Sequence, residues 1–216
     1  MDGYDLDTLA RDVAAVLDEL DLADVLLVGH SLGGTEAARV VGGLGSARVS
    51  QVVLSAAPLP CVQAGPDRPD GVPRELLVAN REWMSRDMGG WIDGNAEGNW
   101  GTAAAAEWRL ATEWTTRRLY ETPLPVLLAC NVTIVESDLR AELASITIPT
   151  LVIHGDVDRS APIELTGRQT AALLQNGSLT VIEGGGHGIY TSFAGEWRDA
   201  VLAFATTAAV QGQVRA

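Results

Sequence analysis

A serine between two glycines, directly after an apolar run, constrains this sequence more than any other feature. The run Val25-Leu26-Leu27-Val28 leads into Gly29-His30-Ser31-Leu32-Gly33, which fits the Gly-x-Ser-x-Gly pattern of a nucleophile elbow. In such an elbow a buried strand turns sharply into a helix and holds the serine in a strained backbone conformation. We therefore predict a strand over 25–29, an exposed Ser31, and a helix that runs on to the stop at Gly42-Gly43.

The glycines of this stretch are explained by the turn. We expect Gly29 and Gly33 to lie where the strand and helix backbones nearly touch, so that a Cβ at either position would clash. Gly34 continues the small-residue surface that lets the helix pack closely. The backbone N–H of Leu32, at the helix N-terminus, is the candidate donor to an oxyanion formed at Ser31.

Length and charge exclude several classes of protein. A chain of 216 residues suits a single domain with one insertion. The net charge of −13 and the absence of a Lys/Arg cluster argue against nucleic acid and anionic membrane as partners. No apolar run approaches the roughly 20 residues that span a bilayer, and no signal peptide is recognisable. We expect a soluble, cytoplasmic protein in which Cys61 and Cys130 are free thiols.

Apolar periodicity predicts alternating helices and strands. Residues 6–20 form an amphipathic helix pattern that Asp5 or Asp7 caps. After the elbow, strand patterns occur at 49–55, 148–155 and 179–182, with helices reaching to about residue 174 and from 193 to about 205. Strands that alternate with helices predict an α/β fold with a parallel open sheet.

The segment from 59 to 144 differs from the rest in composition. Strand patterns vanish there, Pro and Gly are frequent, and five of the six tryptophans fall within it: Trp83, Trp91, Trp100, Trp108 and Trp114. We predict a core formed by 1–58 and 145–216 and an inserted helical cap at 59–144. Taken singly, each tryptophan is expected in the core of the cap, and together they suggest a lid lined with apolar surface.

Candidate catalytic groups follow the predicted strands. A serine hydroxyl needs an imidazole to take its proton and a carboxylate to orient that imidazole. Asp156 and Asp158 follow one strand and His187 follows the next, so all lie with Ser31 at the carboxyl edge of the sheet. The two aspartates remain alternatives at this point: one orients the imidazole, and the other caps the next helix or braces the loop.

Three histidines compete for the role of base. His187 follows three glycines in a loop and is the candidate. His30 is expected to point away from the site, and His154, inside a strand, is expected to be a structural residue with its hydrogen bonds satisfied.

Three motifs resemble the α/β-hydrolase superfamily, namely residues 29–34, 149–158 and 184–188. The segments 3–10 and 69–73 resemble its cofactor-free haloperoxidase and arylesterase group. The resemblance implies that Ser31 is the nucleophile, Asp158 the acid, His187 the base and the Leu32 N–H an oxyanion donor. It further implies acyl transfer from a small-molecule carboxylic ester without metal or organic cofactor, with perhydrolysis of a short carboxylic acid as a side activity.

One departure from the family pattern concerns the start of the chain. Family members carry further strands and a His-Gly loop, which supplies a second oxyanion donor, ahead of the first helix. We therefore expect an N-terminally truncated α/β-hydrolase whose elbow strand is a bare edge, open to homo-oligomer formation. Loss of one oxyanion donor costs roughly 3–4 kcal/mol, so impaired activity is expected. Alternatives are a non-catalytic remnant or ligand-binding module, and a C–C bond hydrolase, lactonase or perhydrolase with the same triad.

Overall fold

Four parallel strands form one open sheet. The computed structural model describes residues 2–45, 47–102 and 105–213. The strands are β1 (Val25–His30), β2 (Val49–Ser55), β3 (Thr150–Gly155) and β4 (Gly177–Ile182), in the spatial order β1-β2-β3-β4. Every neighbouring pair is parallel, so the predicted parallel open sheet is confirmed. The carboxyl ends of all four strands consequently lie along one edge.

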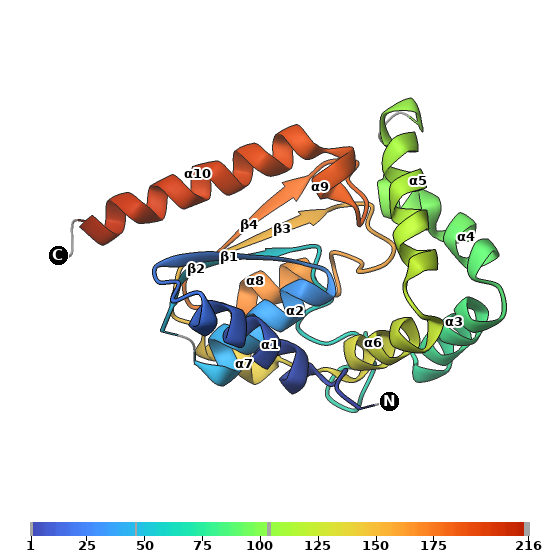
Figure 1. Ribbon diagram of the computed structural model, residues 1–216, viewed down its shortest axis with the longest axis horizontal. Helices are drawn as coiled ribbons and strands as arrows, with labels where there is room; N and C mark the ends of the chain where they lie inside the picture. The colour runs from blue at the N-terminus through green and yellow to red at the C-terminus, as the bar shows by residue number, and fades with distance from the viewer. Residues whose placement is uncertain (1, 46, 103–104, 214–216) are drawn as a thin grey trace.

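Helices cover both faces of the sheet (Figure 1). One face carries α1 (Leu6–Glu19), α2 (Leu32–Arg39), the π-helical turn η1 (Val40–Leu44), α7 (Arg140–Ser145) and α8 (Gly167–Leu173). The other carries α9 (Ile189–Ser192) and α10 (Ala194–Gln213). Asp5 caps α1, because its carboxylate accepts the Thr8 N–H at 3.0 Å. No helix of the described ranges is both long enough and apolar enough to cross a bilayer.

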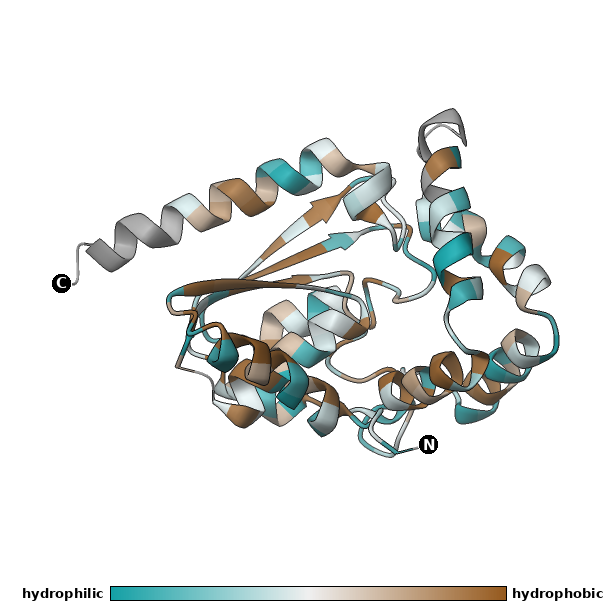
Figure 2. Cartoon of the chain, viewed as in Figure 1, coloured by the Kyte–Doolittle hydropathy of each residue, from teal (hydrophilic) through white to brown (hydrophobic). Residues whose placement is uncertain are grey.

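Each face of the sheet has its own apolar core, since successive strand residues point to opposite sides. Leu54 and Val152 pack against the α2 and α7 face, whereas Ile153 and Ile182 pack towards α9 and α10. Figure 2 shows the apolar residues of the strands enclosed between these helical layers. The strands therefore form a rigid base for the residues that follow their carboxyl ends.

The chain between β2 and α7 is mainly helical, and its helices lie beyond the carboxyl end of the sheet (Figure 1). It contains α3 (Arg74–Arg86), α4 (Met88–Trp100), α5 (Ala105–Glu121) and α6 (Leu124–Glu136), and its described residues form isolated bridges but no strand. The division into a core at 1–58 and 145–216 and a cap at 59–144 remains a proposal. Leu139 and Leu143, which that division assigns to the cap, pack in the core beneath β2.

The tryptophans of this segment do not share one environment. Trp100 is buried, as expected of a cap core, whereas Trp114 on α5 is 59% exposed, because α5 presents that position to solvent. The Arg118 guanidinium lies 6.0 Å from the centre of the Trp114 ring. The side chain of Trp108 lies outside the described part of the chain. The suggestion of a lid lined with apolar surface stays a prediction.

β1 forms an edge of the sheet. It pairs with β2, and on its other side no described strand lies next to it. Val28 is 40% exposed, and Leu26 and Leu27 are half-buried. The edge position agrees with the expectation for the elbow strand, whose outer backbone groups are open to other partners.

Candidate active site

Ser31 occupies the turn between a strand and a helix. β1 ends at His30 and α2 begins at Leu32. The backbone of Ser31 has φ 52° and ψ −123°, a conformation that L side chains rarely adopt and that costs of order 1–3 kcal/mol. Its carbonyl accepts the N–H groups of Gly34 at 2.9 Å and Thr35 at 3.2 Å, which ties the turn to the first turn of α2. The strained serine is thus held by the surrounding structure.

The glycines of the elbow have unequal roles. A Cβ on Gly29 would lie 2.2 Å from the carbonyl oxygen of Gly33, and one on Gly34 would lie 2.7 Å from the Cβ of Ala57. A Cβ on Gly33 would meet no described heavy atom within 4 Å. The predicted clash is therefore correct for Gly29 and wrong for Gly33. The reason is that α2 turns the Gly33 carbonyl, and not its Cα hydrogens, towards the strand.

The structure brings Ser31, His187 and Asp158 into one hydrogen-bonded row. His187 Nε2 lies 2.9 Å from Ser31 Oγ, and His187 Nδ1 lies 2.8 Å from Asp158 Oδ2. An ionised carboxylate can only accept a hydrogen bond, so Nδ1 carries the ring proton and Nε2 is free to accept the hydroxyl proton. The Asp158 side chain is fully buried, whereas Ser31 and His187 reach the surface in part. Both distances are within the range for a general base and its orienting group.

Asp158 is held as a carboxylate. Its Oδ1 accepts the N–H groups of Ser160 and Ala161, both at 2.8 Å, and its Oδ2 lies 3.3 Å from His154 Nε2. Burial alone would raise the pKa of Asp158, but the interaction with His187 and the hydrogen bonds from His154 and His187 hold that pKa well below its usual range. The group facing the imidazole therefore carries a negative charge.

Asp156 has a different task. Its Oδ1 accepts the Gly184 N–H at 2.7 Å and so connects the end of β3 to the loop that leads to His187. Of the two aspartates left open by the sequence, Asp158 is the one that contacts the imidazole, and Asp156 braces the loop. His154 is buried and its Nε2 donates to the Ala161 carbonyl at 2.7 Å, but its Nδ1 is buried without a hydrogen-bond partner among the described residues. The expectation that its hydrogen bonds are satisfied is therefore correct for Nε2 and wrong for Nδ1.

The expectation that His30 points away from the site is wrong. Its Nε2 lies 2.8 Å from the carbonyl oxygen of His187, and the two imidazole centres are 4.9 Å apart. On its other side the ring meets Tyr190 edge-on, with the ring centres 4.6 Å apart. The loop after β4 crosses the carboxyl end of the sheet to reach Ser31, and it therefore covers His30 as well. Nothing in the local pattern of the elbow indicated this long-range contact.

The loop that carries His187 also touches the helical segment. The N–H groups of His187 and Gly188 donate to the carbonyl oxygens of Gly98 at 3.1 Å and Asn99 at 2.6 Å, near the end of α4. A Cβ on Gly186 would lie 2.5 Å from the Gly101 nitrogen. The glycines before His187 thus allow a backbone-to-backbone contact with α4, which the sequence reasoning missed.

The Leu32 N–H lies at the start of α2 and has no hydrogen-bond acceptor within the described chain. The first N–H groups of a helix lack partners inside that helix and carry its positive dipole end. This N–H, beside Ser31, is consequently available to a developing oxyanion.

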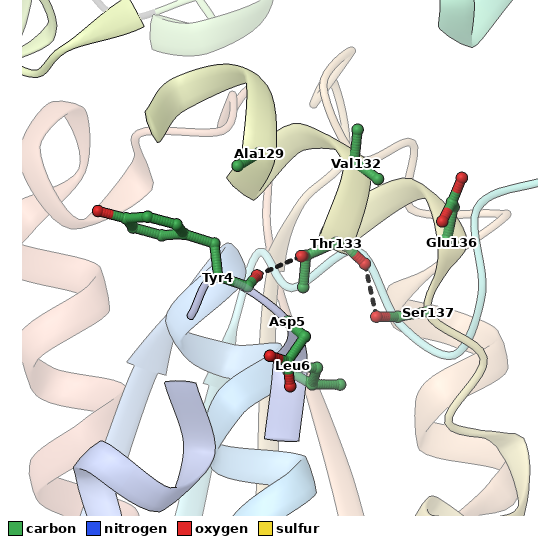
Figure 3. A pocket seen from close by; sticks show the side chains of 8 residues that line it. All are labelled: Tyr4, Asp5, Leu6, Ala129, Val132, Thr133, Glu136 and Ser137. Atoms are coloured by element: carbon green, nitrogen blue, oxygen red, sulfur yellow. Dashed lines mark hydrogen bonds between the residues drawn. The ribbon is translucent and has the colours of Figure 1, made fainter. Parts of the chain in front are cut away.

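Two cavities of the described chain lie away from this row. The larger, of about 430 Å³, lies between the segment Tyr4–Leu6 and α6 (Figure 3), where the Thr133 hydroxyl donates to the Tyr4 carbonyl at 2.5 Å. The second, of about 220 Å³, is lined by Cys61, Arg68 and their neighbours. Neither cavity includes a residue of the Ser31, Asp158 and His187 row. Within the described ranges, no group of three or more His, Cys, Asp or Glu residues could hold a metal ion.

Comparison with known proteins identifies the family. The sequence matches the alpha/beta hydrolase family over residues 1–202. A non-heme chloroperoxidase of Kitasatospora aureofaciens is 36% identical over 192 residues, which cover 87% of this chain and 69% of the relative. A bifunctional esterase/perhydrolase of Acinetobacter calcoaceticus is 30% identical over 221 residues, which cover 94% of this chain and 75% of the relative.

Solved structures agree with this result. A bromoperoxidase from Bacillus anthracis superposes with a TM-score of 0.85 at 29% identity, over 94% of this chain and 75% of that one. An esterase from Exiguobacterium antarcticum superposes with a TM-score of 0.87 over the same shares, and at 24% identity it supports the fold alone. The homologues comprise haloperoxidases and esterases, which supports a hydrolase acting on a small molecule. The chain belongs to the α/β hydrolase family, within the group of cofactor-free haloperoxidases.

Proposed function

We propose that this protein is a serine hydrolase that cleaves small carboxylic esters by acyl transfer. The observation that carries the proposal is the continuous row from Ser31 Oγ to His187 at 2.9 Å and from His187 to Asp158 at 2.8 Å. A serine hydroxyl with a positioned imidazole, itself oriented by a buried carboxylate, is the arrangement that activates serine as a nucleophile.

The reaction would proceed in two halves. In the first, His187 Nε2 takes the hydroxyl proton while Ser31 Oγ attacks the ester carbonyl carbon, and the Leu32 N–H donates to the resulting oxyanion. When the tetrahedral intermediate collapses, His187 passes the proton to the leaving alcohol. In the second half, His187 deprotonates a water molecule that attacks the acyl carbon. The acid leaves and the proton returns to Ser31 Oγ.

Asp158 would serve in both halves without changing its own protonation. Its carboxylate accepts from His187 Nδ1 and so fixes the tautomer in which Nε2 is a base. The negative charge also stabilises the imidazolium that forms in each half. The lowered pKa of Asp158 supports this role, because a carboxylate that stays ionised does not compete for the proton.

Hydrolysis of p-nitrophenyl acetate tests the proposal. We expect the purified chain to release p-nitrophenol and Ser31→Ala to lose at least about 1000-fold in kcat. Ser178→Ala is the matched control. Ser178 is an exposed serine near the start of β4, whereas Ser31, His187 and Asp158 lie at the carboxyl ends of the strands. Equal turnover by Ser31→Ala and Ser178→Ala would show that Ser31 is not the nucleophile.

A second candidate activity, perhydrolysis, is favoured by the likeness to a bifunctional esterase/perhydrolase. In it, hydrogen peroxide replaces water in the second half: the peroxide oxygen attacks the acyl carbon, a peracid leaves, and Ser31 recovers its proton through His187. Formation of peracetic acid from p-nitrophenyl acetate and hydrogen peroxide would be measured. Peracid formation that is lost with Ser31→Ala supports this activity, and unchanged p-nitrophenol release without peracid excludes it.

A further inference from the structure

Both backbone polar groups of His187 are bonded, and to different parts of the molecule. The N–H donates to Gly98 at the end of α4, and the carbonyl oxygen accepts from His30 Nε2 at 2.8 Å. His30 is the residue before Ser31 in the elbow. The elbow therefore contacts His187 twice. The Ser31 hydroxyl contacts the His187 ring, and the His30 ring contacts the His187 backbone carbonyl.

The surroundings of His30 fix its chemical state. A carbonyl oxygen only accepts, so Nε2 of His30 must carry the proton in this contact. The ring is packed between the rings of His187 and Tyr190, which leaves it little freedom to turn. Burial lowers the pKa of His30 to about 4, with a smaller contribution from His187, so the imidazole is neutral at neutral pH.

We propose that His30 is a positioning residue that sets the place of the His187 imidazole relative to the Ser31 hydroxyl. The inference rests on the proposed function of the row formed by Ser31, His187 and Asp158. The ring of His187 is bonded to Ser31 and Asp158, but its backbone belongs to a glycine-rich loop, and the only bonds described for that backbone are the N–H bond to Gly98 and the carbonyl bond from His30. The His30 bond therefore helps to fix the position from which the His187 ring reaches Ser31. His30 does not touch the reacting atoms, so it acts through His187.

Loss of the His30 imidazole should slow the chemical step of the reaction. Misplacement of a catalytic group by about 1 Å can cost about 100-fold in rate. Because His30 lies behind His187 and not at the acyl carbon, its loss should lower kcat and leave KM nearly unchanged.

Two variants separate the effect of the hydrogen bond from His30 to the His187 carbonyl from the effect of side-chain size at position 30. His30→Gln keeps an N–H donor the same number of bonds from Cβ as Nε2, and His30→Met has a chain of the same length without a donor. Turnover of p-nitrophenyl acetate should fall about 10- to 100-fold in kcat for Met, with KM changed less than about threefold, and Gln should recover most of the loss. Equal kcat in Met and wild type, or equal losses in Met and Gln, would overturn the proposal.

A second measurement does not depend on activity. Hydrogen exchange of the His187 and Gly188 amides reports how firmly the loop is held against Gly98 and Asn99. These amides should exchange at least about tenfold faster in His30→Met than in wild type or His30→Gln. If wild type fails to hydrolyse esters yet shows this exchange pattern, the proposed function is wrong and the positioning role stands. If esters are hydrolysed and exchange is the same in all three proteins, the positioning role is wrong.

Discussion

Two aspartates separated by one residue have separate tasks, and the structure predicts unequal effects of changing them. Asp158→Asn would present an amide to His187 Nδ1 and favour the wrong tautomer, so kcat should fall by about 1000- to 10,000-fold. Asp156→Asn keeps an oxygen that can accept from Gly184 and should cost less than about tenfold. Steady-state kinetics of both variants on one ester decide this. Comparable losses in the two would remove the distinction between an orienting and a bracing carboxylate.

The neutral, partly buried imidazole of His30 predicts a pH dependence of stability. Its pKa is lowered from 6.5 to about 4 in the fold, so between these values the unfolded chain binds the proton and the folded chain does not. The free energy of unfolding should therefore decrease as the pH falls, by about 2 kcal/mol between pH 7 and pH 5 from this residue.

Other groups facing His30 are His187, Asp158, His154 and the Tyr190 ring. Asp158 has a lowered pKa, and its stabilising contribution is present above 3.8 and lost below it, so it does not alter the window from pH 7 to pH 5. Urea unfolding of wild type and His30→Gln at both values measures the difference. A loss of stability that is the same in the two proteins would contradict a neutral His30.

At the scale of elements, the strand-to-helix turn of the elbow distinguishes two glycines that look alike in the sequence. Gly29→Ala would force a methyl group against the Gly33 carbonyl, which is backbone and cannot yield cheaply, and should destabilise by about 1–3 kcal/mol. Gly33→Ala adds a methyl group in open space within α2 and should be neutral or stabilising by up to about 1 kcal/mol. Thermal unfolding compares the pair. A Gly33→Ala variant less stable than Gly29→Ala would mean that the packing of the elbow is different.

Elements with strong local signals could be predicted from the sequence. Patterns within a single element predicted the strand β1 and the Asp5 cap of α1. The alternation of strands with helices predicted that the strands are parallel. The environment of each tryptophan could not be predicted, because exposure of Trp114 depends on how α5 lies against helices distant in sequence. The same applies to Leu139 and Leu143, whose burial beneath β2 is set by tertiary packing.

At the scale of the whole molecule, the candidate site is assembled from three strand ends and the end of α4. Chain order and the common edge of a parallel sheet were enough to predict that Ser31, an aspartate and His187 would meet. The sequence could not show which aspartate contacts His187, or that His30 and α4 contact it. Those contacts depend on the path that the loop after β4 takes across the sheet. The contacts of His30 and α4 with His187 join residues more than 80 positions apart, and no local pattern encodes them.

Activation of the Ser31 hydroxyl by His187 is the step on which the proposed function depends most. Labelling with a fluorophosphonate probe, followed by mass spectrometry of the digested protein, tests this step directly, because the probe bonds covalently only to an activated serine. We predict one label, on Ser31, in wild type and in Ser178→Ala, and at least a 100-fold slower reaction in His187→Ala. Labelling of Ser31 at the same rate without His187, or no labelling of a folded wild-type chain, would contradict the account.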